Sequence, residues 1–253
     1  AKLTNVYSTK FSVKIKDGEN KCIYTQQWSD NMKLCGTPKI KKYSGATSSV
    51  SITFVPDWKR FGMTKMDDSI YKIFEKRVYD ANICTSQNCK VKFQGEALPK
   101  ATFNTYAKMY TKSDEMCTFI SDRWSVCIAP SDDGFEHVSF VNGICTTKGG
   151  SHVDHVSGIL ANGIIDDMAK KIKLRPQQVK NAFFVFVKST LVNPSFSSQV
   201  KSECTLKPQD FGSKFEPSKT FIKNILKTSI QTELMALSKF REMKELKKTD
   251  GSR

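Results

Sequence analysis

Two lysines are the residues whose type and position most clearly suit phosphate chemistry. Lys201 stands in a polar loop after the apolar run 183–187, and a lysine on a loop after a rigid central strand is well placed to reach into a site. Lys2 stands at the start of the chain. On the residues alone, ordinary surface lysines are the favoured interpretation of both, because the chain holds 40 Lys and Arg residues.

A basic cluster forms a third candidate for contact with phosphate. It consists of Lys170, Lys171, Lys173 and Arg175, and it follows an apolar stripe of helical spacing. Cations suit the C-terminal end of a helix because they face its partial negative charge. The cluster therefore fits a contact with a nucleic-acid backbone and fits a solvated helix end equally well.

Self-contained catalytic motifs are missing from the sequence. It has no GxxxxGK[ST] loop, no GxSxG elbow and no HExxH pair. The carboxylate pairs 132–133 and 166–167 are adjacent in sequence. Because neighbouring side chains point apart in strands and helices, solvated surface is the favoured interpretation of both pairs.

Cysteine and histidine spacing does not favour a metal site. Among the eight Cys, only Cys84 and Cys89 lie close together, whereas zinc sites usually show two close pairs or a pair with His. Free thiols are the better interpretation. His152 and His155 could share a helix face, but no third ligand is near, so packing at a helix start is favoured.

Length and charge indicate a globular protein with a polyanionic partner. The chain has 253 residues and a net charge of +15, which favours nucleic acid first and an acidic membrane second. Residues 1–112 hold 20 cationic and 9 acidic side chains (20 − 9 = +11), and residues 113–253 hold 20 and 16 (20 − 16 = +4). No run of about 18 apolar residues predicts a membrane span. The first residue is Ala1 rather than Met, which is typical of a chain that begins inside a longer sequence.

The first half of the chain is predicted to be rich in strands. Alternating apolar and polar residues predict strands at 11–15, 22–28 and 50–55. Helical spacing predicts a helix over 67–81 and a short one over 102–110, with a short strand at 91–93 between them. The polar stretch 111–115 is the expected domain boundary.

The second half is predicted to build a sheet with a crossover helix. Strands are expected at 124–128, 136–141 and 183–187, the last buried because it is apolar on both faces. A helix begins after Gly149-Gly150, with Ser151 as N-cap and Asp154 closing a capping box, and reaches Met168. Two helices, 218–227 and 230–247, finish the chain. This pattern predicts a mixed α and β fold whose sheet is covered on one face.

Several ordered segments resemble eukaryotic-type DNA topoisomerase II. The most specific is Asn-Pro-Ser-Phe-Ser-Ser-Gln-Val-Lys at 193–201, with Phe-Gly-Ser at 211–213 after it. Thr-Lys-Gly-Gly-Ser-His-Val at 147–153 is also distinctive. The other matching segments are 1–3, 7–11, 27–32, 52–57, 139–142 and 178–181.

The resemblance implies an α+β fold in two domains. Residues 1–112 would be the C-terminal part of a Bergerat-type ATPase domain, an α/β sandwich. Residues 113–253 would be a transducer domain with a βαβ crossover and C-terminal helices. In the family, these domains form the gate that closes on ATP.

The resemblance also implies roles for particular residues. Ala1 and Lys2 match the end of the family's ATP lid, which holds the nucleotide phosphates. Gln199 and Lys201 match its Gln-Thr-Lys switch loop, whose Lys reaches the γ-phosphate as sensor and stabiliser. Val200 replaces the Thr of that loop, so only a backbone contact to ATP is expected there.

DNA contacts are implied for the loop after the transducer helix. Lys170 and Lys171 fall in the family's lysine-rich loop, which is shorter here, and Lys173 and Arg175 extend the same basic stretch. Val50 replaces a Thr of the family's pattern, so a hydroxyl contact to nucleotide is not expected from that position.

The resemblance implies ATP and Mg²⁺ as cofactors, with the Mg²⁺ ligands expected outside this chain. The family's catalytic Glu and its metal-binding Asn would precede Ala1, and the DNA-cleaving Tyr would follow Arg253. The implied partners are double-stranded DNA, the remainder of the topoisomerase and a second copy in a homodimer, with no membrane. The implied location is the nucleus.

Two other interpretations stay open from the sequence. The chain could be a non-hydrolysing basic DNA-binding or clamp module of the same ATPase superfamily. It could also come from another branch of that superfamily, such as a mismatch-repair ATPase or a heat-shock chaperone. The loop at 193–201 and the Gly-Gly-Ser-His-Val segment favour the topoisomerase.

We expect the purified 253-residue chain to bind nucleotide weakly and to hydrolyse no ATP, because it holds the phosphate sensor without the general base. A phosphate-release assay with and without duplex DNA measures this. ATP turnover stimulated by DNA in the pure chain would contradict the prediction.

Overall fold

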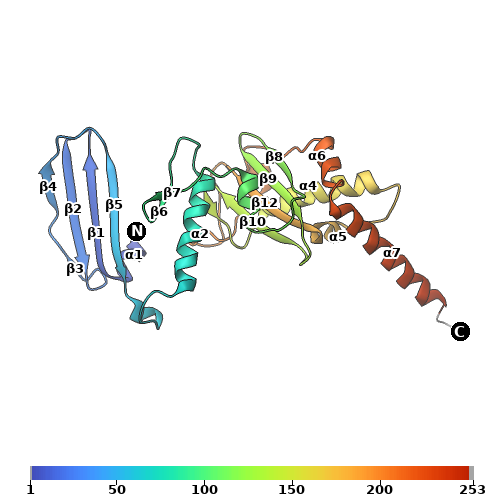
Figure 1. The fold of residues 1–253 in the computed structure, drawn as a ribbon, viewed down its shortest axis with the longest axis horizontal. Coiled ribbons are helices and arrows are strands. Elements are labelled where there is room, and N and C mark those ends of the chain that lie inside the picture. Colours follow the sequence, from blue (N-terminus) through green and yellow to red (C-terminus); the bar gives the residue numbers. More distant parts are fainter. Residues whose placement is uncertain (1, 251–253) are drawn as a thin grey trace. The chain divides into compact units, whose positions relative to one another are not determined.

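The computed structural model describes residues 2–250. The chain folds into two compact units, residues 1–74 and residues 75–253. Each unit is built around its own β-sheet (Figure 1).

The first unit is an antiparallel sheet with little helix. It contains helix α1 (Lys2–Val6) and strands β1 (Ser8–Asp17), β2 (Cys22–Ser29), β3 (Leu34–Cys35), β4 (Lys39–Lys42) and β5 (Ser49–Pro56), followed by the 3₁₀ turn η1 (Trp58–Phe61). The strand order is β3-β2-β1-β5, and β4 also pairs with β2. The strands predicted at 11–15, 22–28 and 50–55 are confirmed as the cores of β1, β2 and β5.

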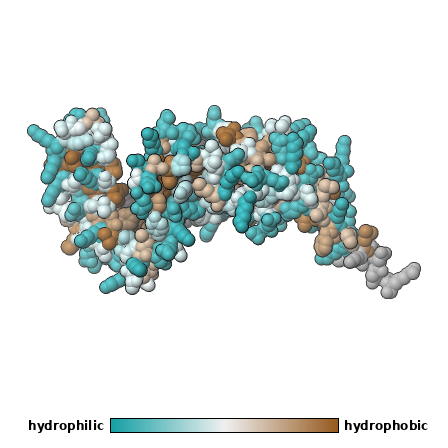
Figure 2. Space-filling view, in the orientation of Figure 1, coloured by the Kyte–Doolittle hydropathy of each residue, from teal (hydrophilic) through white to brown (hydrophobic). Residues whose placement is uncertain are grey.

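One face of this first sheet is apolar. Phe11 lies opposite Trp28 on one side and opposite Phe54 on the other, so the three rings share a face. Val50 and Ile52 of β5 continue that face and are 66% and 51% exposed. On this unit, Figure 2 shows hydrophobic residues among hydrophilic ones.

Helix α2 (Asp68–Cys84) begins in the first unit and ends in the second. It confirms the helix predicted over 67–81. The hairpin of β6 (Lys92–Phe93) and β7 (Glu96–Ala97) turns at Gln94 and Gly95, both with positive φ. Helix α3 (Phe103–Ala107) then begins after its N-cap Thr102, whose side chain accepts a bond from the Thr105 amide.

The second unit is a mixed five-stranded sheet with helices. Its strands are β8 (Cys117–Ile120), β9 (Trp124–Pro130), β10 (Glu136–Val141), β11 (Ile144–Cys145) and β12 (Phe183–Ser189), in the order β11-β10-β12-β9-β8. Strands β10 and β12 are parallel and are joined through α4 (Ser151–Met168) and α5 (Pro176–Asn181). The predicted βαβ crossover is therefore confirmed.

Three further elements close the second unit. They are the 3₁₀ turn η2 (Pro208–Asp210) and helices α6 (Lys219–Ile225) and α7 (Ser229–Asp250). Ile230 and Leu234 of α7 are fully buried, whereas Phe240 further along is 68% exposed. Only the first turns of α7 therefore contribute to the core.

Both faces of the second sheet are packed, so the expectation of one covered face was wrong. Residues of β9 alternate: Val126 and Ile128 belong to a cluster with α4, α6 and α7, while Cys127 and Ala129 belong to another. The second cluster takes Ile83 from α2 and Phe103 from α3. The apolar spacing of α2 and α3 indicates helices but not which sheet face they pack against, because tertiary contacts determine this.

The predicted domain boundary between residues 112 and 113 stays a prediction. The compact units divide at residue 74 instead, because Ile83, Phe103 and Tyr106 pack in the second unit. Compact packing shows which residues share a core. It does not show where the ATPase domain of the family ends and the transducer domain begins.

Candidate functional site

The loop that carries Lys201 begins at the end of the central strand β12. The Asn142 side chain holds its first residues, because it donates to the Leu191 carbonyl at 3.0 Å and accepts from the Leu191 amide at 2.8 Å. Asn142 adopts a positive φ of 49° in the turn after β10. The ends of the two parallel strands are thereby tied together where the loop starts.

The loop then folds back on itself as a narrow hairpin. Phe196 forms an antiparallel bridge with Cys204. The Ser197 amide donates to the Glu203 carbonyl at 3.1 Å, and the Thr205 amide donates to the Ser195 carbonyl at 2.9 Å. We call residues 195–205 the switch hairpin.

A backbone ladder fixes the switch hairpin to the start of α4. The Cys204 amide donates to the Gly149 carbonyl at 3.0 Å, and the Ser151 amide donates to the Cys204 carbonyl at 2.9 Å. Gly150 sits between them with φ +119°, and a Cβ there would lie 2.2 Å from the Cys204 oxygen. The contact therefore requires glycine at position 150.

Ser151 does not cap α4 in the way that the sequence predicted. Gly150 occupies the N-cap position, and no side-chain cap is formed. The Ser151 hydroxyl donates instead to the backbone oxygens of Leu206 and Cys204. The predicted capping box with Asp154 was wrong, because this hydroxyl serves the hairpin rather than its own helix.

The tip of the switch hairpin presents the residues that the sequence singled out. Gln199 and Val200 are exposed, Val200 by 81%. Lys201 has a left-handed φ of 60°, and its amide donates to the Ser198 carbonyl at 3.0 Å. Its Nζ lies 5.7 Å from the ring centre of Phe196. In the described part of the chain, no carboxylate forms an ion pair with Lys201.

The other predicted phosphate ligands belong to the first unit. Lys2 is the exposed first residue of α1, and Ala1 lies outside the described residues. Val50 lies on β5 with its side chain exposed. That Lys2 and Lys201 bind one nucleotide together stays a prediction.

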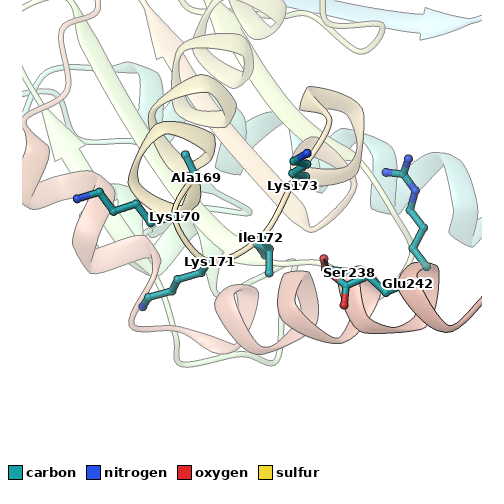
Figure 3. Close-up of a pocket in the computed structure, with 8 residues that line it drawn as sticks. Ala169, Lys170, Lys171, Ile172, Lys173, Ser238 and Glu242 are labelled. Carbon is teal, nitrogen blue, oxygen red and sulfur yellow. Dashed lines mark hydrogen bonds between the residues drawn. The ribbon is translucent and has the colours of Figure 1, made fainter. Parts of the chain in front are cut away.

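The predicted DNA-binding lysines line a basic crevice in the second unit. Lys170, Lys171 and Lys173 lie on the loop after α4 and, together with residues of α7, line a hollow of about 390 Å³. Figure 3 shows Ser238 and Glu242 among the residues that α7 contributes. Arg241 of α7 also lines it. We call this hollow the basic crevice.

Arg175 is displaced from the crevice but remains connected to it. It is the N-cap residue of α5 and does not line the hollow. Gln178 Oε1 accepts a bond from the Arg175 amide at 2.9 Å and one from the Arg241 guanidinium at 3.5 Å. One amide side chain therefore links the loop to α7.

Sequence reasoning missed Arg241 and Ser238 as members of this site. The cationic spacing of Lys239, Arg241 and Lys244 is visible along α7. Nothing in that spacing indicates that α7 returns to the end of α4, because this depends on how Ile230 and Leu234 pack.

The histidines serve packing and hydrogen bonding. His152 is fully buried, and its Nε2 lies 3.2 Å from the Thr146 hydroxyl, which in turn bonds Ser139 at 2.6 Å. Burial lowers the pKa of His152 to about 3. His155 packs against the rings of Trp124 and Phe211 instead. In the described residues, no group of three metal-ligating side chains is present.

The mixed fold is that of a topoisomerase II ATPase region. The ATPase region of Saccharomyces cerevisiae topoisomerase II matches with a TM-score of 0.88 and 35% identity, over 94% of this chain and 63% of that one. The ATPase and transducer domains of DNA topoisomerase II from Balamuthia mandrillaris match with a TM-score of 0.87 and 32% identity, over 96% and 64%. The predicted fold class is confirmed.

The family model described as DNA gyrase B matches residues 91–245, and the chain belongs to that family. It is 36% identical over its whole length to DNA topoisomerase 2 of Arabidopsis thaliana, of which it covers 18%. The corresponding enzyme of Penicillium chrysogenum is 38% identical and 17% covered. The chain thus spans less than a fifth of these two relatives. The resemblance to eukaryotic-type topoisomerase II is confirmed.

Within residues 2–250, no helix combines the length and the apolar character that crossing a bilayer requires.

We expect the buried His152 to make folding stability depend on pH. Its pKa is lowered from 6.5 to about 3 on folding, so below pH 6.5 only the unfolded chain takes up this proton. Above about pH 6.5, His152 therefore has no effect on the free energy of unfolding. As the pH drops from there toward 3, the free energy of unfolding decreases by up to about 1.4 kcal/mol per pH unit.

Urea unfolding between about pH 4.5 and 6 measures this dependence. The His152→Gln variant should show a shallower slope than the wild type, whereas His155→Gln, whose imidazole is only partly buried, should change the slope less. An equal slope in wild type and His152→Gln would show that His152 is not the group responsible.

Proposed function

We propose that this chain is part of an ATP-dependent type II DNA topoisomerase and relays nucleotide state to double-strand DNA passage. The observation that carries the proposal is the switch hairpin, which presents Lys201 at its tip and is bonded to the first turn of α4. The relatives named DNA topoisomerase 2 support it.

Lys201 is the residue that we assign to the γ-phosphate of ATP. Its ammonium has no carboxylate partner in the described chain, and its nearest described ring is Phe196. A phosphate group attracts an ammonium more strongly than an aromatic face does. Bound ATP would therefore draw Lys201 away from Phe196, and hydrolysis would release it.

The same contact would assist hydrolysis. A cation fixed at the transferring phosphoryl group stabilises the charge that develops in the transition state. Gln199 and Val200 precede Lys201 at the hairpin tip and would bind the phosphates beside it. Ala1 and Lys2 would bind them from the first unit.

Mg²⁺ is implied by the family, but the described residues do not fit it. They contain no cluster of acidic, His or Cys side chains suited to a metal ion. No step proposed for this chain goes through the metal, and its ligands are expected on other residues of the enzyme.

Helix α4 is suited to transmit the nucleotide state to DNA. Its first turn is bonded to the switch hairpin, and the loop with Lys170 and Lys171 follows its last turn. Its 18 residues span about 27 Å at 1.5 Å per residue. Leu160 and Ile164 bury its apolar face completely, so the helix moves with the core.

The basic crevice is the surface that we assign to duplex DNA. Lys170, Lys171 and Lys173 lie around it with Arg241, and Arg175 follows as the N-cap of α5. Contacts of this kind neutralise phosphates and read no base sequence. We also propose a homodimeric gate, the rest of the topoisomerase as partner, and the nucleus as location.

We expect Lys201→Met, made in the complete enzyme, to lower kcat for ATP by roughly 10²- to 10³-fold, the usual cost of removing one charge-stabilising donor. Steady-state ATP hydrolysis with saturating DNA measures this. Lys207→Met removes the same charge from an exposed position beyond the hairpin and should leave kcat unchanged.

Two results would contradict this assignment. An unchanged kcat in Lys201→Met would remove Lys201 from the phosphate site. A complete wild-type enzyme that binds ATP and DNA without turning ATP over would favour the non-hydrolysing clamp instead.

We expect the double variant Lys170→Gln Lys171→Gln to weaken binding of this chain to duplex DNA uniformly across sequences. The slope of log K against log salt should fall by roughly 0.9 for each DNA phosphate that the variant leaves without a cation. Fluorescence anisotropy at several salt concentrations measures it. Lys207→Gln Lys214→Gln is the matched control, and an equal decrease of the slope in both variants would show that only net charge matters.

A further inference from the structure

A second polar pocket lies at one end of the strands of the second sheet, away from the basic crevice. It has a volume of about 400 Å³ and stands where the parallel strands β10 and β12 end. In open α/β sheets, ligands bind in crevices outside the carboxyl ends of parallel strands. Its lining includes Arg123, Asn142, Gly143, Lys188 and Thr190.

Lys188 is the unusual residue of this pocket. It follows Phe184 and Phe186 on the same face of β12, where both rings belong to an apolar cluster. The side chain is half-buried, and its Nζ donates to the Ile83 carbonyl at 3.2 Å. Within residues 2–250 no carboxylate pairs with it. A half-buried cation without an opposite charge is unfavourable unless something else neutralises it.

The neighbouring thiols do not supply that opposite charge. Cys84 lines the same pocket, and burial raises its pKa to about 12 even though the charge of Lys188 opposes the shift. Burial also raises the pKa of Cys145. Both thiols are therefore neutral at pH 7 and do not supply an opposite charge to Lys188.

The other groups of the pocket suit an oxyanion. Arg123 contributes a second cation, and its carbonyl accepts a 2.9 Å bond from the Thr190 amide, which fixes the two residues together. Ser125 and Thr190 add hydroxyl groups to the lining. Asp122 is the one acidic residue in the lining, and both Asp122 and Arg123 are exposed. Two cations against one carboxylate leave the pocket positive.

We propose that this pocket binds a phosphate-class oxyanion, inorganic phosphate or a phosphate monoester, through Lys188 and Arg123. An ammonium and a guanidinium together offer several directed N–H donors, which match the several acceptor oxygens of phosphate better than they match chloride. The site is separate from the tip of the switch hairpin. Because Thr190 belongs to the pocket and begins the loop that leads to Lys201, a bound anion would stiffen the start of that loop.

Site-resolved NMR of the ¹⁵N-labelled 253-residue chain tests the proposal. Sodium phosphate is titrated at constant ionic strength, with sodium chloride making up the difference. The amide signals of Gly143 and Thr190 should shift and saturate. Lys188→Met should weaken the apparent affinity roughly tenfold, the usual cost of one hydrogen bond to a charged group. Lys207→Met, an exposed control, should leave the affinity unchanged.

Two further variants keep the result decisive. Arg123→Gln should weaken phosphate binding in the same way, and it provides the test if Lys188→Met does not fold. Lys201→Met should retain the response to phosphate, so a failure of the γ-phosphate assignment is distinguishable from a failure of this one.

Three results would overturn the proposal. One is a shift that stays linear in phosphate and equals the shift with chloride. Another is an equal decrease of affinity in Lys207→Met and Lys188→Met, which would indicate a general effect of charge. The third is saturation of these signals by a short DNA duplex but not by phosphate, which would make nucleic acid the ligand.

Discussion

The backbone ladder between Cys204 and residues 149–151 is the contact on which the functional part of the structure depends. It joins a polar hairpin, which has little apolar surface of its own, to the first turn of the deeply buried helix α4. The ladder requires glycine at position 150, where a Cβ would collide with the Cys204 oxygen. Because hydrogen bonds between backbone groups are directional, the hairpin is held in one orientation rather than merely near the helix. Lys201 at its tip is thereby positioned by the core.

The packed core behind α4 explains why a contact at the first turn of this helix can affect the loop that follows its last turn. Val156, Leu160 and Ile164 are fully buried against the sheet, and close-packed interiors do not deform continuously. A displacement of the switch hairpin would therefore move the helix as a body. The loop that follows α4 carries Lys170 and Lys171, so the proposed phosphate sensor and the proposed DNA-binding surface share one rigid element.

The sequence predicts regular elements well where apolar spacing is strong. The stripe of Val153, Val156 and Leu160 locates α4, and the uninterrupted apolar run 183–187 locates β12 as a central strand. Prediction from the sequence fails where tertiary contacts determine the hydrogen-bond partner of a side chain. Ser151 has the right type for an N-cap, yet its hydroxyl bonds Leu206, a residue 55 positions away.

The two pockets show the same limit. Arg241 reaches the basic crevice only through the packing of α7, which the spacing of its cations does not reveal. Lys188 is one of 40 cationic residues, so the sequence alone does not distinguish it as a candidate ligand. It becomes distinctive only when its buried strand is placed beside the end of α2.

Nucleotide state is proposed to reach α4 through the switch hairpin, and hydrogen exchange of the complete enzyme, with and without a non-hydrolysable ATP analogue, tests this most directly. We predict that the analogue increases protection of the Lys201 amide and of the Val153 and Asp154 amides, which bond the Gly150 carbonyl, together. Protection of the hairpin with no change in the first turn of α4 would contradict the relay.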